Sequence, residues 1–231
     1  MQTGWDSGYG HSCGCHIRKP LWAEELCHAL GVEIGSTDLD LANVPAIRTL
    51  LSSCLGLLMI ETSSSPVRLV HFSLQEHLLS DPTISQSPHS TIAEVCLPYL
   101  NFRSVRELSP TLYAPLTMPF LKYASLDWTR HTKKGMTENV RMLALLLLDR
   151  FDEHISAQPP PVKYRQDNDL GRKFSLKGGP VGFTGLHGAA YLGIVEAVAT
   201  IMEMKESDPN ASDCTGRTAL TLAAYQGTRR W

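Results

Sequence analysis

The sequence has few charged and few aromatic residues, and its charges nearly cancel. Charged residues make up 19% and aromatic residues 7% of the 231 positions, and the formal net charge is −2. A chain this close to neutral has no overall electrostatic attraction for nucleic acid or for an anionic membrane, although a local basic patch remains open. Its 43% of hydrophobic residues is typical of a globular protein with one large or two small domains.

The sequence also lacks a long apolar run and a secretory leader. Its longest such run, MLALLLL at 142–148, is too short to span a bilayer. The first twenty residues are polar and rich in glycine, unlike a signal peptide. We therefore expect a cytoplasmic protein with reduced thiols and without a membrane partner.

No catalytic or cofactor motif is present. The chain has no Gly-x4-Gly-Lys-[Ser/Thr] phosphate loop and no Gly-x-Ser-x-Gly nucleophile elbow. The only cluster of metal-binding residue types has a Cys-x-Cys spacing, which is a poor match to zinc sites (His11, Cys13, Cys15 and His16, with Cys27 and His28 following in a helical pattern). We predict that the protein is not an enzyme and holds no metal or cofactor.

Composition and periodicity divide the chain into five segments. We predict a disordered tail (1–20), a winged-helix domain (21–82), a helical connector (83–157), a linker rich in proline and glycine (158–181) and truncated ankyrin repeats (182–231). The predicted fold class is mainly α, with a small β-hairpin in the winged helix.

The pattern within 21–82 is helix, helix, hairpin, helix. Apolar residues recur at helical spacing in 22–34 and again around 47–55. Two short β-rich runs, 57–61 and 67–72, flank a serine-rich turn and predict a hairpin. Ser73 and Glu76 have the spacing of a capping box that would start the next helix.

The segment 83–157 predicts three helices: one from about Ser90, one over 118–132 and one over 137–155. Thr137 is the expected N-cap of the last of these.

A similar stretch occurs twice near the end of the chain, at an offset of 34 residues. The ankyrin repeat has a period of about 33 residues and the signature Thr-Pro-Leu-His-x-Ala. The positions that match it are Thr184, Leu186, His187, Ala189 and Gly193 in the first copy, and Gly216, Thr218, Leu220, Ala223 and Gly227 in and just before the second.

Each copy predicts a short helix that packs closely on its neighbour. Alanines such as Ala189 and Ala223 allow close approach, and Gly193 and Gly227 are expected to end their helices in the left-handed conformation. We expect a structural role for His187 and for the threonines, as hydrogen-bond partners in turns.

The two copies depart from the signature. Proline is missing from both, histidine is missing from the second, and the second copy stops after its first helix. About three repeats are usually needed for stability. Either the preceding helical region caps the repeats, or the chain is a fragment; the abrupt ending favours truncation.

Taken together, these segments resemble the fungal NACHT–ankyrin proteins, which are signalling ATPases of the STAND class. The stretches RKPLWAEELCHALGVEI, VRLVHFSLQEHL, HSTIAEVCLPYLNF and GFTGLHGAAYLGIVEAV carry the resemblance. It implies a winged helix of the type named after GPI inositol-deacylase, a helical connector and the first ankyrin repeats. The NACHT module is absent, and the deacylase name implies no activity here.

The resemblance also implies a role for one residue. His71 matches a histidine at the end of the wing that contacts the β-phosphate of ADP, so it would be a vestigial nucleotide-sensing position. The alternative is a buried residue at the end of a strand.

The function that these observations favour is a non-catalytic, regulatory module that binds another protein. Two alternatives stay open: nucleic-acid binding through the winged helix, for which Arg48 and Arg68 offer little positive charge, and a non-functional truncated gene product.

Overall fold

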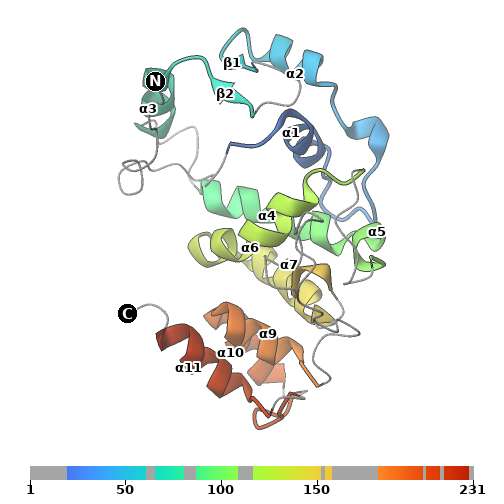
Figure 1. The fold of residues 1–231 in the computed structure, drawn as a ribbon, viewed down its shortest axis with the longest axis vertical. Helices are drawn as coiled ribbons and strands as arrows, with labels where there is room; N and C mark the ends of the chain where they lie inside the picture. Colours follow the sequence, from blue (N-terminus) through green and yellow to red (C-terminus); the bar gives the residue numbers. More distant parts are fainter. Residues whose placement is uncertain are drawn as a thin grey trace, which may run out of the picture.

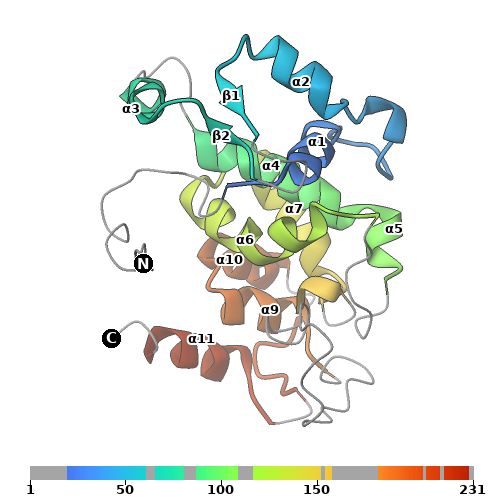
Figure 2. The same ribbon diagram turned by 45° about the horizontal axis from the view of Figure 1, so that its top comes forward.

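The computed structural model describes residues 20–60, 66–80, 87–108, 117–151, 154–157, 182–204, 207–213 and 216–228. The predicted disordered tail, except Pro20, and the predicted linker lie outside the described residues. The described chain is mainly helical, with one small two-stranded antiparallel sheet. It forms three tiers along its longest axis (Figures 1 and 2).

The first tier holds a hairpin among short helices. Its elements are α1 (Ala23–Leu30), η1 (Leu41–Asn43), α2 (Ile47–Ser53), β1 (Leu58–Met59), β2 (Arg68–Leu69) and α3 (Phe72–Ser80). The strands pair with Leu58 opposite Leu69. An antiparallel β-bridge between Trp22 and Pro66 joins the residue before α1 to the segment that leads into β2. This order agrees with the order expected from the sequence, while the winged-helix assignment stays a prediction.

The start of α3 differs from the predicted capping box. The helix begins at Phe72, one residue before Ser73, and the ring of His71 takes the place of the cap: its Nδ1 accepts a hydrogen bond of 3.2 Å from the backbone N–H of Ser73. The prediction of Ser73 as the N-cap is therefore wrong, because Ser73 already lies inside the first turn.

The second tier is a helical layer. It consists of α4 (Pro88–Asn101), α5 (Arg103–Arg106), α6 (Leu121–Lys134), α7 (Glu138–Leu148) and η3 (Ile155–Ala157). The three predicted helices of this segment are present. Thr137 caps α7 as predicted, because its hydroxyl oxygen accepts a hydrogen bond of 3.1 Å from the N–H of Val140.

The third tier contains α9 (Gly185–Leu192), α10 (Val195–Met204) and α11 (Ala219–Thr228). Helix α9 packs against α10, α11 and α7, and α10 also packs against α7. Figure 1 shows α11 at the end of the molecule farthest from the hairpin.

One continuous hydrophobic core joins the second and third tiers. Its largest fully buried side chains include Trp128, Tyr99 and Phe151. Ala189, Ile194 and Ala197 of the third tier belong to the same cluster. The second tier therefore covers part of the third, since α7 packs directly on α9 and α10. The interpretation of the third tier as ankyrin repeats capped by this layer stays a prediction.

Candidate interaction surfaces

The His187 ring joins the first copy of the repeated stretch to the hairpin that precedes the second. Thr184 is the N-cap of α9, and its N–H donates a hydrogen bond of 3.2 Å to His187 Nδ1. Because Nδ1 accepts, Nε2 carries the proton, and it lies 3.1 Å from the carbonyl oxygen of Ala211 and 3.2 Å from that of Arg217. With the ring buried, these contacts support the structural role expected from the sequence.

The hairpin between α10 and α11 is closed by a buried carboxylate. The side chain of Asp213 accepts hydrogen bonds of 3.0 Å from the backbone N–H and from Nε of Arg217. Gly216 completes the turn at a φ of +76°, and its N–H donates to the carbonyl of Asp213. Such a φ strains residues that have a Cβ, which explains glycine at this position.

Gly182 is a second turn glycine that the sequence analysis missed. It lies 34 positions before Gly216 and also has a positive φ, of +82°. A Cβ on Gly182 would meet the carbonyl oxygen of Ser212 at 3.1 Å, so the two turns lie next to each other. The signal that could have found it was in the sequence: the same offset that relates the threonines also relates these glycines.

Of the two glycines expected to end helices, one does so. Gly193 follows α9 with φ +67° and ψ +41°, the left-handed conformation predicted for it. Helix α11 instead runs through Gly227 to Thr228, so the prediction of a helix end at Gly227 is wrong. The difference follows the packing: α9 must turn at once into α10, whereas α11 meets no such turn within the described residues.

The second copy also exposes a face that the first copy buries. Leu186 is 2% exposed and packs against Ala219 beneath α11, but its counterpart Leu220 is 77% exposed. Ala223 is exposed as well, although Ala189 is completely buried. The close helix packing expected around Ala223 is therefore not observed in the described structure.

His71 lies on the surface, two residues beyond β2. Its ring is exposed and stacks near that of Phe72, with 4.6 Å between the ring centroids. The alternative of a buried residue at a strand end is therefore wrong, and the nucleotide-sensing role stays a prediction. Arg48 on α2 and Arg68 on the hairpin are both exposed.

The surface around the hairpin is rich in exposed apolar side chains. Helix α2 buries none of its residues. Leu55, which follows α2, is 88% exposed and has a φ of +49°, an uncommon conformation for a leucine. The other large apolar side chains that this surface exposes are Leu57, Met59, Val70 and Phe72. We call these four residues, together with Leu55, the hairpin surface.

Two histidines far apart in the sequence meet in the second tier, and the sequence analysis did not pair them. His89 Nδ1 lies 2.9 Å from His131 Nδ1, and His131 Nε2 lies 3.0 Å from the hydroxyl of Tyr123. His131 is completely buried. The described residues contain no group of three or more His, Cys, Asp or Glu side chains able to hold a metal ion. The pair joins α4 to α6 by hydrogen bonding.

Comparison of the chain with protein-family models, with curated proteins and with solved structures gave no match in any of the three. Among the described residues, no helix combines the length and apolar character needed to cross a bilayer.

Proposed function

We propose that this protein is a non-catalytic module that binds another protein through the hairpin surface, as part of a signalling protein of the NACHT–ankyrin type. The single observation that carries the proposal is the exposure of large apolar side chains around the hairpin. Large apolar side chains that are exposed within one short part of the fold, and not buried in the protein's own core, are typical of interaction sites.

The conformation of Leu55 supports this proposal. A leucine with positive φ costs free energy, and a polar surface turn would ordinarily have asparagine or glycine there. Since the side chain is 88% exposed, folding of the described chain gains nothing from it. Burial of this side chain against a partner would offset that cost, which explains an apolar residue at this position.

The third tier supports the same class of function. The capped helix α9, its left-handed end at Gly193 and the His187 contacts agree with a stacked repeat, an architecture whose surfaces commonly bind proteins. Assignment of these helices to the ankyrin family, and of the first tier to the winged-helix family, is part of the proposal.

The test compares proteins captured by the immobilised full chain with those captured by two variants. Leu55→Asn removes an exposed apolar side chain and introduces a residue that tolerates positive φ, so the fold should be unharmed. Val195→Asp changes another exposed apolar residue, 73% exposed, on α10 in the third tier, and is the control. We expect a protein captured by the wild type and the control to be lost with Leu55→Asn.

Capture of the same proteins by all three chains would contradict the proposal. Nucleic-acid binding is tested separately, by gel shift with duplex DNA and RNA at low salt. If the chain shifts the nucleic acid and Arg48→Gln and Arg68→Gln weaken this binding, the result would favour nucleic-acid binding over protein binding as the function.

A further inference from the structure

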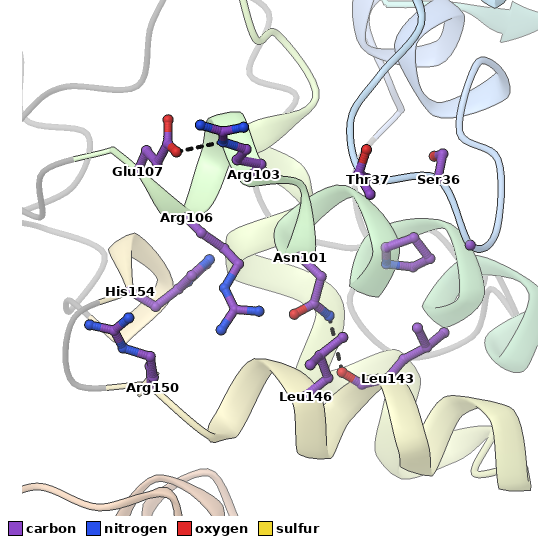
Figure 3. A pocket seen from close by; sticks show the side chains of 12 residues that line it. Ser36, Thr37, Asn101, Arg103, Arg106, Glu107, Leu143, Leu146, Arg150 and His154 are labelled. Carbon is purple, nitrogen blue, oxygen red and sulfur yellow. Dashed lines mark hydrogen bonds and ion pairs between the residues drawn. The ribbon is translucent and has the colours of Figure 1, made fainter.

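A cavity of about 540 Å³ lies where the loop after α1 meets α5 and the facing sides of α4 and α7 (Figure 3). Pro98, Leu143 and Leu146 give it an apolar wall, and Gly35 lies in the loop at its other side. The cavity is large enough for a small organic molecule. It is remote from the hairpin surface and is not used by the proposed function.

Hydrogen bonds between the first and second tiers hold the loop in place. The N–H of Arg103 donates to the carbonyl of Thr37 at 3.0 Å. Ser104 donates to the carboxylate of Asp38 from its backbone N–H at 3.3 Å and from its hydroxyl at 2.5 Å. These hydrogen bonds fix the loop to α5, so the wall that the loop contributes to the cavity has a defined position.

Asn101 presents a buried acceptor at this cavity. Its amide nitrogen donates to the carbonyls of Leu97 at 3.0 Å and Leu143 at 3.1 Å. Since both partners are acceptors, the orientation of the amide is fixed, and its oxygen is the atom left over. That oxygen is buried and accepts no hydrogen bond in the structure. A buried acceptor without a donor costs about 1–3 kcal/mol, which favours a ligand that donates to it.

The charged side chains that line the cavity are mainly positive. They comprise three arginines and one carboxylate, Glu107, which is held by Nε of Arg103 at 2.7 Å. Arg106 is half-buried, and no residue that the structure describes forms a hydrogen bond or ion pair with its guanidinium. Figure 3 shows this guanidinium pointing towards Asn101 and His154. A partly desolvated cation in this position favours a negatively charged ligand.

His154 closes the cavity without adding charge. Its ring is buried, and its Nδ1 accepts a hydrogen bond of 3.0 Å from the N–H of Ser156. The proton is therefore on Nε2, which donates to the carbonyl of Leu100 at 2.9 Å. With both nitrogens used by the protein, the ring is neutral and forms part of the cavity wall. The positive charge at the cavity therefore comes from its arginines, and Arg106 is the one whose guanidinium lies between His154 and Asn101.

We propose that this cavity binds a small organic anion with a carboxylate or phosphate group and, next to it, a hydroxyl group. Arg106 donates to the oxygens of the anionic group. The oxygen of Asn101 accepts a hydrogen bond from the hydroxyl group. The apolar wall of Leu143 and Leu146 contacts the carbon skeleton.

The first experiment measures binding to the purified full chain by isothermal titration calorimetry at constant ionic strength. The carboxylate probes are lactate and propanoate, which differ by the hydroxyl group, and the phosphate probes are glycerol 3-phosphate and inorganic phosphate. We expect the hydroxylated member of at least one pair to bind about fivefold or more tightly than the other, since only it satisfies Asn101. The pair that binds identifies the anionic group.

The second experiment uses variants. Arg106→Gln should weaken binding of the better probe about tenfold or more, because a charge-assisted hydrogen bond is lost. Arg106→Lys keeps the charge but loses the planar fork, so an intermediate affinity is expected. Arg48→Gln, at an exposed site on α2 remote from the cavity, should bind like the wild type. Thermal melting of each variant checks that it is folded.

Three results would overturn the proposal. The first is a wild-type chain that binds no probe at concentrations up to about 10 mM. The second is equal affinity in folded Arg106→Gln, Arg106→Lys and wild-type chains. The third is equal weakening by Arg48→Gln, which would show that only the overall charge of the protein matters.

Discussion

Residues at equivalent positions in the two copies differ in burial and in hydrogen bonding. His187 is buried and contacts Thr184, Ala211 and Arg217, whereas Thr221, at the equivalent place in the second copy, is exposed and bonds only within its own turn, to Thr218. The ring reaches the hairpin because a second unit follows α9. Within the described residues α11 has no such neighbour, so its equivalent position makes no contact of this kind.

His187→Ala should lower the free energy of unfolding by about 2 kcal/mol, since it removes a buried ring and leaves the carbonyl of Ala211 without its donor, while the carbonyl of Arg217 keeps the N–H of Asp213. Thr221→Ala is the matched control and should change it by less than about 0.5 kcal/mol. Urea denaturation measures both. Equal changes in the free energy of unfolding would show that the His187 contacts do not stabilise the fold more than the exposed Thr221 does.

The two glycines expected to end helices give a second matched pair. Gly193→Ala should destabilise the protein by about 1 kcal/mol, because alanine is strained at the φ of +67° found there. Gly227→Ala should stabilise it by up to about 0.5 kcal/mol, because Gly227 lies inside α11 with nothing near the added methyl group. Shifts of the thermal midpoint in the same direction for both variants would contradict the assigned conformations.

At the scale of elements, α9 is the helix on which the arrangement of the second and third tiers depends. It packs between α7 and α11, and glycines allow its close approach to α7. A Cβ on Gly185 would meet the carbonyl oxygen of Leu148 at 2.6 Å, and one on Gly188 would meet the ring of Phe151 at 2.7 Å. The first contact would require movement of the backbone at the end of α7, and the second would require displacement of the buried Phe151 ring.

Gly185→Ala should therefore destabilise the protein by about 2 kcal/mol, because its methyl group meets backbone, which cannot rotate away. The buried Trp128 contacts Phe151 next to this interface, so its fluorescence during urea denaturation follows the loss. An effect no larger than that of Gly193→Ala would mean that α7 and α9 are less closely packed than described.

At the scale of the whole molecule, one core spans the second and third tiers, and it contains weak acids that must stay neutral. Burial, and to a smaller extent the charge of Asp127, raises the pKa of the Cys96 thiol. Burial also raises the pKa of the phenols of Tyr99 and Tyr123. In the unfolded chain these groups lose their protons at ordinary pKa values, of about 8.5 for cysteine and about 10 for tyrosine.

Stability should consequently fall as the pH rises above about 8.5, because the unfolded state then binds fewer protons than the folded state. Each fully buried group contributes a slope of up to about 1.4 kcal/mol per pH unit above its unfolded pKa. Urea denaturation at pH 8, 9 and 10 measures the slope. Cys96→Ala should reduce it, and Cys54→Ala, at a half-buried position, is the control. Identical slopes in both variants would contradict the burial of the Cys96 thiol.

Local pattern predicted much of the fold. The helical spacing of apolar residues predicted the helices of the second tier, and Thr137 and Gly193 took the capping conformations expected of them. The 34-residue offset predicted a helix in each copy, which α9 and α11 confirm, and a hydrogen-bonding role for His187 in a turn, which its contact with Thr184 supports. The caps depend on residues within one or two turns of each other, so they can be read from neighbouring positions in the chain. The contacts of His187 with Ala211 and Arg217 lie farther apart and were not predicted.

Contacts between distant segments could not be read in this way. The sequence does not show that Asn101 is held between Leu97 and Leu143 while Arg106 lies beside it, or that His89 meets His131. It predicted matching helix ends at Gly193 and Gly227, and close helix packing around both Ala189 and Ala223, which the structure does not have. The physical reason is that the identities of a residue and of its neighbours in the chain determine its local conformational preferences. Its burial, charge environment and partners depend instead on which elements pack around it.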